Sequence, residues 1–313
     1  DATTALRTIA AALARAWPGT TVHLLPGVYD QDVTTVRHGR ADAPIVIDGT
    51  REAVLRGAGG ARVIEIGHDH HWLTGFTIDG RAGDPDTARG YRDKLVFVLG
   101  REPRRGPVGT VLRGLRLAHA GGECVRLRYF VRDSRIEDND VGPCGIYDFR
   151  FAGGGENGQG VYIGTSLEQL TDGKNATADR DASTGNIVRG NRLDTRGAEC
   201  VAVKESADRN RIERNLCTGV GRAEMAGLDV RSSGNAIEGN DLFGHPGAAI
   251  RLGGATEGDG VSNDVVGNHL HDNGGPALRL LRGPQGRVCG NRLANNGGGA
   301  VDGAAVDPTA SCP

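Results

Sequence analysis

The sequence lacks the features that mark a membrane protein or a nucleic-acid-binding protein. It contains no run of about 18 apolar residues, which excludes a membrane-spanning helix. The formal net charge is −2 over 313 residues, so no strong field points to nucleic acid or to an anionic membrane. Aromatic residues make up only 4%, whereas glycine occurs 51 times and 38% of the residues are hydrophobic. That balance is too apolar and too patterned for a disordered chain.

The cysteines also lack the C-x-x-C spacing that is typical of zinc sites. They are even in number, and the chain begins with Asp1 rather than methionine, so we expect a mature or trimmed secreted protein with up to three disulfides. Six buried free thiols are the alternative. Pairing between sequence neighbours is one of the possible connectivities, namely Cys124 with Cys144, Cys200 with Cys217 and Cys289 with Cys312.

A repeat of the form N-x-I/V-x-x-N-x-L is present in the second half of the chain. Its second asparagines lie 23 to 28 residues apart, at positions 191, 215, 240, 268 and 291. A leucine-rich repeat has a similar period, but here there are too many strands per period and the helical half is missing. We therefore predict an all-β fold, a single-stranded right-handed parallel β-helix with coils of about 24 residues. The asparagines would form a hydrogen-bonded ladder at one corner, which is a structural role.

A short amphipathic helix is predicted before the first coil. Apolar residues recur at helical spacing between Thr3 and Trp17, and Pro18-Gly19 ends the pattern. The first coil of a solenoid otherwise exposes apolar surface, so we expect residues 1–18 to cap it. The whole chain, residues 1–313, is expected to be one domain.

Three segments interrupt the repeat spacing and are predicted to leave the solenoid as loops. They lie near residues 81–91, 143–155 and 167–183. The last two flank the strand one coil before Lys204. Loops on a rigid scaffold commonly carry binding function, so we expect these two to wall a groove. Tolerated surface insertions are the alternative.

The strongest functional signal is a lysine and an arginine at equivalent positions of consecutive strands, Lys204 and Arg231. Neighbouring coils lie about 4.8 Å apart, where two cations repel by about 3 kcal/mol at an effective dielectric near 20. This suggests an anionic ligand across the coils. Arg231 should also depress the pKa of Lys204 towards a value useful for a general base. Nearby Glu199, Glu205 and Asp229 keep open the alternative of a salt-bridged solvated face.

Further cationic and aromatic residues extend this surface along the stack, as a linear polyanion would require. Two histidine groups are weaker candidates. A metal site at His68, His70 and His71 competes with a polar coil corner, and His269 and His271 would share a face if extended, although a corner position favours a structural role. We assign substrate binding to Tyr162, Glu205, Asp229, Arg251, Arg128 and Arg279.

Part of the chain resembles the chondroitinase-B and alginate-lyase family of right-handed β-helix polysaccharide lyases. The pattern Glu-x-x-x-x-Lys-x-Ser from Glu199 to Ser206, followed by an asparagine corner and a strand ending in Arg231, carries the resemblance. The segment from Asn157 to Ser166 is similar to that family's N-G-x-E-x-I-R-I-G-x-S stretch. The resemblance covers roughly residues 157–240, and the other coils match only as generic β-helix.

The resemblance implies a secreted lyase that cleaves a uronic-acid-containing polysaccharide by β-elimination. Lys204 would remove the proton at C5, and Arg231 would stabilise or protonate the leaving glycosidic oxygen. Glu199 would be one acidic ligand of a calcium ion that neutralises the uronate carboxylate. The sequence departs from the family at Gly197, where a second acid is expected, and at Tyr162, where the family has an arginine.

Other functions fit the same scaffold. A C5-epimerase needs the same groups apart from help to the leaving group, and a glycoside hydrolase would want paired carboxylates on one face. A non-catalytic polysaccharide-binding β-helix is the alternative from a different class. In each case the expected partner is an anionic polysaccharide, with no nucleic acid and no membrane, and the expected state is a monomer.

Overall fold

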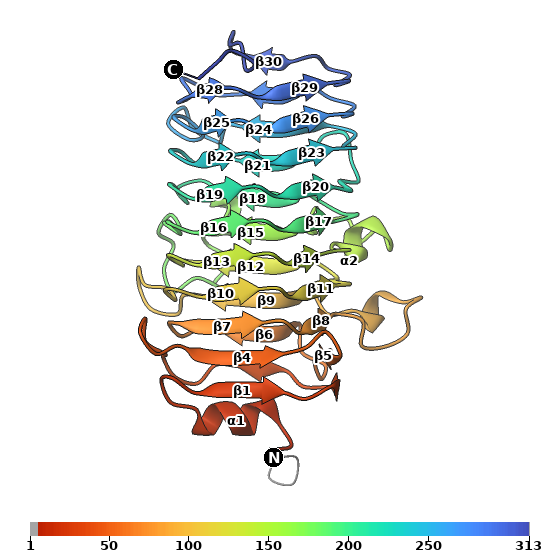
Figure 1. Cartoon of the computed structure of the whole chain (residues 1–313), viewed down its shortest axis with the longest axis vertical. Coiled ribbons are helices and arrows are strands. Elements are labelled where there is room, and N and C mark those ends of the chain that lie inside the picture. The colour runs from red at the N-terminus through yellow and green to blue at the C-terminus, as the bar shows by residue number, and fades with distance from the viewer. Residues whose placement is uncertain (1–5, 313) are drawn as a thin grey trace.

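The chain forms a right-handed parallel β-helix with very little helix, as predicted. The structure, a computed structural model, describes residues 6–312. Its strands stack in three parallel sheets of ten strands each, and every coil contributes one strand to each sheet. The described ends of the chain therefore lie at opposite ends of the stack (Figure 1).

The three sheets are named here in the order in which the chain first enters them. Sheet A contains β1 (Thr21–Leu24), β4 (Ile45–Gly49), β7 (His71–Thr74), β10 (Val111–Arg113), β13 (Arg135–Glu137), β16 (Ile187–Arg189), β19 (Arg211–Glu213), β22 (Ala236–Glu238), β25 (Asp264–Val266) and β28 (Val288–Cys289). Sheet B contains β2 (Gly27–Tyr29), β5 (Ala53–Leu55), β8 (Thr77–Asp79), β11 (Arg116–Ala118), β14 (Asp140–Val141), β17 (Arg192–Asp194), β20 (Leu216–Thr218), β23 (Asp241–Phe243), β26 (His269–His271) and β29 (Arg292–Ala294). Sheet C contains β3 (Val33–Thr34), β6 (Arg62–Ile66), β9 (Lys94–Leu99), β12 (Val125–Arg128), β15 (Val161–Ile163), β18 (Val201–Val203), β21 (Ala226–Val230), β24 (Ala248–Leu252), β27 (Leu278–Leu280) and β30 (Val301–Gly303).

The core lies between the three sheets and is built from columns of equivalent apolar residues. Because side chains alternate across a strand, every second residue points inward and stacks on its counterparts in the coils above and below. One such column of sheet C is fully buried and consists of Val125, Val161, Val201, Leu228, Ile250 and Leu278.

The predicted asparagine ladder is confirmed. At one corner, the side-chain amide of each asparagine donates a hydrogen bond of 2.9–3.0 Å to the side-chain oxygen of the next. Burial of an amide is costly unless it is hydrogen-bonded, so the ladder fixes the register of the coils. Its members are Asn139, Asn191, Asn215, Asn240, Asn268 and Asn291.

The capping helix is confirmed, but α1 (Ile9–Arg15) is shorter than predicted. It begins after Thr8, whose side chain accepts a hydrogen bond from a backbone N–H of the first turn, and its apolar face is buried on the first coil. Trp17 was expected to end this face, yet it is 68% exposed beyond the helix. The predicted start at Thr3 lies outside the described residues.

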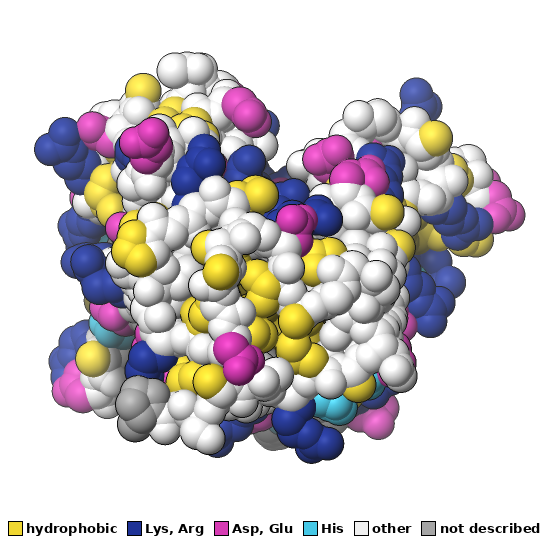
Figure 2. Space-filling view, turned by 90° about the horizontal axis from the view of Figure 1, so that it is seen from above, with side chains coloured by type: hydrophobic (Ala, Val, Ile, Leu, Met, Phe, Trp, Pro, Cys, Tyr) yellow, Lys and Arg dark blue, Asp and Glu magenta, His cyan; other side chains and the backbone are white. Residues whose placement is uncertain are grey.

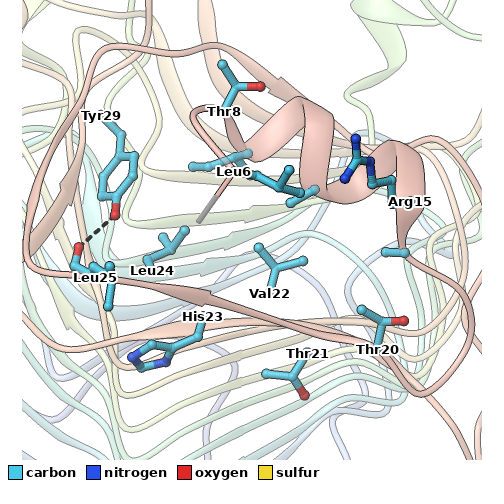
Figure 3. Close-up of a pocket in the computed structure, with 13 residues that line it drawn as sticks. Leu6, Thr8, Arg15, Thr20, Thr21, Val22, His23, Leu24, Leu25 and Tyr29 are labelled. Carbon is cyan, nitrogen blue, oxygen red and sulfur yellow. Dashed lines mark hydrogen bonds between the residues drawn. The ribbon is translucent and has the colours of Figure 1, made fainter. Parts of the chain in front are cut away.

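A cavity of about 320 Å³ separates α1 from β1 and the following turn (Figure 3). Leu24 and Val22 line it together with Tyr29, whose hydroxyl donates to the backbone oxygen of Leu25 at 2.7 Å. The cavity is at the capped end of the stack, several coils from Lys204, so we do not assign it to the candidate site.

The three sequence-local disulfides are confirmed. Two of them join the beginning of a sheet C strand to the sheet B segment one coil later, and the third attaches the C-terminal tail to β28. They are Cys124–Cys144, Cys200–Cys217 and Cys289–Cys312. Across residues 6–312, no helix combines the length and the apolar character needed to cross a membrane.

The three interruptions of the repeat leave the solenoid at the two edges of sheet C. Residues 81–91, with η1 (Ala88–Gly90), and residues 143–155, with α2 (Ile146–Phe149), both connect sheet B to sheet C. Residues 167–183, with η2 (Leu167–Gln169), connect sheet C to sheet A. Sheet C is therefore flanked on both sides, and Figure 2 shows a notch between two projecting walls with Lys and Arg side chains at its floor.

Candidate active site

Lys204 and Arg231 occupy the same outward column of sheet C on adjacent coils. Each directly follows its strand, and their backbone N–H groups donate to the oxygens of the preceding coil, to Ile163 at 2.9 Å and to Val203 at 2.8 Å. The equivalent positions on the coils before and after are glycines, Gly164 and Gly253. Neither position carries a side chain, although Leu281 and Arg282 pack close to Gly253, and Ala207 packs close to Gly164.

The Lys204 side chain is mostly buried, with 11% of it exposed. Its Nζ atom lies 3.7 Å from Oδ2 of Asp229 and 4.9 Å from the ring centroid of Tyr162. Burial lowers the pKa of Lys204, but Tyr162, Asp229 and Glu199 raise it, and the net direction is upward. Arg231 acts downward, as predicted, but the prediction that it lowers the pKa overall is wrong because the surrounding acids outweigh it. Lys204 is therefore an ammonium ion at neutral pH.

Asp229 connects Lys204 to Arg251, the next residue along its own column. Arg251 holds the carboxylate with two contacts, Nε to Oδ1 at 2.9 Å and Nη2 to Oδ2 at 2.8 Å. Burial would raise the pKa of Asp229, yet the hydrogen bond from Arg251 and the charge of Lys204 lower it. Asp229 is fully buried, so it positions the two cations, whereas Arg251 keeps part of its side chain exposed.

Glu199 lies beside this group and is also buried. Gln159 donates to its Oε2 at 3.0 Å from the preceding coil. Burial and the charge of Asp229 raise the pKa of Glu199, while Lys204 opposes them. Glu199 therefore holds a proton more readily than an ordinary glutamate.

The surroundings of Glu199 do not fit the calcium site that the resemblance implied. Calcium takes six to eight oxygen ligands. Within residues 6–312, Glu199 belongs to no cluster of three or more carboxylate, imidazole or thiolate ligands, and Gly197 supplies no side chain. The cation that lowers the pKa of Glu199 is the Lys204 ammonium instead.

Tyr162 lies between two cations rather than open to a sugar ring. Arg126, from the coil before, lies over its ring at 3.5 Å from the centroid, and Lys204 comes from the coil after. The residue is buried, so its ring face is not open to a substrate sugar. The hydroxyl of Tyr162 is the group of this residue that could transfer a proton.

Arg231 is the most accessible cation of the pair, with 30% of its side chain exposed. Its Nε lies 3.4 Å from Oε1 of Glu205, which is almost completely buried. Glu205 was predicted to bind substrate, but its burial gives it the different role of orienting Arg231.

Two predicted substrate-binding residues are not brought to this site. Arg128 is buried and bonded to Asp172 at 2.7 Å and to Asn175 at 2.6 Å, both in the 167–183 loop. Arg279 lies three coils beyond Lys204 and pairs with Asp302 at 3.0 Å. Arg128 therefore anchors the 167–183 loop, and Arg279 is remote from Lys204 and Arg231.

Sequence reasoning missed several residues that shape the site. Gln159 could have been found, because it precedes Val161 by the same two positions that separate Glu199 from Val201. Arg180 could not, since it crosses the wall to reach Asp259 at 3.1 Å, 79 residues further along the chain.

Comparison with known proteins places the chain in a family. The family model described as "Periplasmic copper-binding protein (NosD)" matches residues 139–306, more than half of the chain. The chain belongs to this family. No curated protein matches it.

Several solved structures share the fold of this NosD-family chain. An alginate lyase from Paenibacillus sp. str. FPU-7 has a TM-score of 0.71 at 19% identity, covering 94% of this chain and 96% of that one. Pectate lyase Pel9A has a TM-score of 0.66 at 13% identity, covering 96% and 74%. A DFA-IIIase from Arthrobacter chlorophenolicus A6 has a TM-score of 0.57 at 15% identity, covering 91% and 76%. The predicted resemblance to β-helix polysaccharide lyases is thus confirmed as a likeness of fold.

Proposed function

We propose that this protein is a polysaccharide lyase that cleaves a uronate polymer by β-elimination. The observation that carries the proposal is the Lys204–Arg231 pair, stacked on adjacent coils of sheet C between two glycine positions, with the Tyr162 ring centroid 4.9 Å from the Lys204 Nζ atom. The fold shared with an alginate lyase and a pectate lyase supports it. So does the absence of a paired-carboxylate arrangement open to solvent here, because Glu199 and Asp229 are both buried.

The chemistry of β-elimination explains why these groups are needed. A proton at C5 of a uronate is only weakly acidic, so its removal requires a base and stabilisation of the developing enolate. Arg231 and Arg251 are the partly exposed cations that would neutralise the uronate carboxylate, without calcium. Lys204, once it has lost a proton, would abstract the C5 hydrogen.

The leaving glycosidic oxygen requires a proton as the C4–O bond breaks. An arginine guanidinium does not give up a proton in proteins, so Arg231 would stabilise that oxygen by charge only. The Tyr162 hydroxyl is the neighbouring group that can donate a proton. We therefore assign Lys204 as base, Tyr162 as proton donor and Arg231 as electrostatic stabiliser.

We also propose a location outside the cytoplasm. The three disulfides are typical of oxidising compartments, and the family that matches the chain is described as periplasmic. A soluble uronate polymer of the cell envelope or the surroundings would be the substrate class.

The proposal is tested by incubating the protein with a panel of uronate polymers and recording the ultraviolet absorbance of the unsaturated product. Growth of that signal, abolished in Lys204→Ala and retained in Lys174→Ala, is expected. Lys174 is a matched control because it is an exposed lysine of the neighbouring wall. New reducing ends without the absorbance would mean hydrolysis, altered C5 configuration without cleavage would mean epimerisation, and retention without product would mean binding alone. Each of these three outcomes rejects the lyase.

A further inference from the structure

A pair of histidines on sheet B forms an H-x-H arrangement on a strand. His269 and His271 lie on β26, with Leu270 buried between them. The two imidazoles therefore share the outward face, and their rings stack with centroids 4.1 Å apart. The predicted corner position of this pair is wrong, because the corner asparagine, Asn268, precedes the strand.

A carboxylate from the neighbouring coil completes the group. Asp241 on β23 is in register with His269. Its Oδ1 atom lies 3.2 Å from Nδ1 of His269 and 3.0 Å from Nε2 of His271. The three potential ligand atoms all lie within 4.8 Å of one another, so a single ion could contact all of them.

Another carboxylate, that of Asp272, contacts the other ring nitrogen of His271, Nδ1. Oδ2 of Asp272 lies 2.6 Å from Nδ1 of His271, and Oδ1 of Asp272 accepts a hydrogen bond from Asn295 at 2.9 Å. A histidine that donates its Nδ1–H to Asp272 presents the Nε2 lone pair to Asp241. Two acceptors 3.0 Å apart require a cation between them, either a second proton or a metal ion. A carboxylate that orients a metal-binding histidine in this way is common around metal centres.

The remaining ring contact holds His271 in place. Phe243, in register with it on β23, stacks on the imidazole with centroids 5.1 Å apart and planes 14° apart. All four side chains project from paired strands rather than from a loop. The donor set is thus held by the sheet before any ion binds.

We propose that Asp241, His269 and His271 bind a divalent first-row transition ion. Two imidazoles and one carboxylate suit Zn²⁺, Cu²⁺ or Ni²⁺, whereas Ca²⁺ and Mg²⁺ prefer oxygen ligands alone. Three protein ligands leave part of the coordination sphere to water. The site bridges β23 and β26 on sheet B, whereas Lys204 and Arg231 lie on sheet C. The ion therefore takes no part in the proposed elimination, and the inference stands independently of it.

The test is isothermal titration of the chelator-treated full chain with Zn²⁺, and with Ca²⁺ as a comparison ion. One Zn²⁺ per chain is expected, with much weaker heat from Ca²⁺. His269→Ala and His271→Ala should each weaken Zn²⁺ binding by at least about tenfold, and Asp272→Asn should weaken it by about 10-fold through the orientation of His271. His23→Ala is the matched control, because His23 also pairs with a single aspartate, Asp48, at 2.9 Å on an exposed face.

A second measurement identifies the ligands directly. The electron paramagnetic resonance spectrum of the Cu²⁺ form should show coupling to imidazole nitrogens in the wild type and in His23→Ala, and should lose it in the double variant His269→Ala/His271→Ala. Circular dichroism establishes that this variant is folded, as expected for substitutions on the outer face. The proposal is overturned if wild type binds no Zn²⁺, or if the folded double variant binds it as tightly as wild type, which would move the ion to another group such as His38 and His68.

Discussion

Two segments of sheet C have the same sequence pattern and opposite electrostatics. Glu123 to Arg128 and Glu199 to Lys204 both read Glu-Cys-Val followed by an outward cation, they lie two coils apart, and each cysteine forms a disulfide one coil onward. In the first, Lys94 contacts Glu123 at 2.8 Å. Although burial alone would raise the pKa of Glu123, Lys94 and Arg126 lower it to about 2. In the second, the pKa of Glu199 is raised.

The difference arises from what covers each segment. The 167–183 loop lies over the first, where Gln169 accepts from Arg126 at 2.8 Å and Asp172 pairs with Arg128. In the second segment, glycines occupy the positions equivalent to Lys204 and Arg231 on the coils before and after. Lys204 contacts the carboxylate of Asp229 only at 3.7 Å. The same scaffold thus makes one closely paired ion network, which is structural, and one group whose lysine forms no close ion pair, which we propose acts on a ligand.

The largest effect is expected from removing the cation of the open segment. Lys204→Ala should lower turnover by about 10²–10⁴-fold, the usual contribution of a general base. Its thermal midpoint should stay close to that of wild type, because Lys204 forms no close ion pair. Initial rates and thermal melts are the measurements, and Lys174→Ala is the control. Retention of full turnover in Lys204→Ala would remove the base from the mechanism.

The pH dependence of the rate provides the next largest effect. The pKa of Lys204 is raised, so the base form is scarce at neutral pH and becomes more abundant as pH rises. We expect kcat/KM to increase about tenfold per pH unit over the range below that pKa, where log population of the base form has unit slope. A pH series on a soluble uronate polymer measures it. A profile that falls between neutral and alkaline pH would contradict the assignment of Lys204 as base.

The first segment, with its closely paired charges, should instead respond in stability. Glu123→Gln leaves Lys94 and Arg126 without their buried partner, and such losses cost about 3–5 kcal/mol of unfolding free energy. Glu199→Gln should cost less than about 1 kcal/mol, because the protein already disfavours the charged form of that residue. Urea unfolding measures both variants, and equal losses would show that the two segments do not differ as described.

The acid limb of the stability curve should separate the same two residues. A carboxyl whose folded pKa is depressed stabilises the protein above its unfolded pKa, so the contribution of Glu123 should vanish as pH falls from about 4.5 to about 2. Glu199 has a raised pKa, so its contribution has the opposite sign and is lost as pH rises through its folded pKa. Unfolding free energies across this range should become flatter in Glu123→Gln. An unchanged acid limb in that variant would rule out Glu123 as its source.

These contrasts mark the limit of what the sequence could predict. Periodicity was sufficient for the coils, the asparagine ladder and the stacking of Lys204 on Arg231, since each depends on residue spacing alone. It left the pairing of the six cysteines open. It could not show that the loop would bury Arg128, because that contact joins residues 44 positions apart through an irregular segment. Nor could it give the direction of the Lys204 pKa, which is a balance between burial and charges on three coils.

The smallest expected effect is that of a chelator on turnover. The proposed mechanism assigns neutralisation of the uronate carboxylate to Arg231 and Arg251, which are both partly exposed, so removal of divalent ions should leave kcat and KM unchanged. The same treatment should remove any transition ion that is bound by Asp241, His269 and His271. Rates are measured before and after dialysis against a chelator, and the metal content is measured in parallel. The comparison shows whether turnover on sheet C depends on a metal ion bound on sheet B. Activity that is lost and then restored by Ca²⁺ would return calcium to sheet C, whereas restoration by Zn²⁺ alone would link the sheet B site to the chemistry.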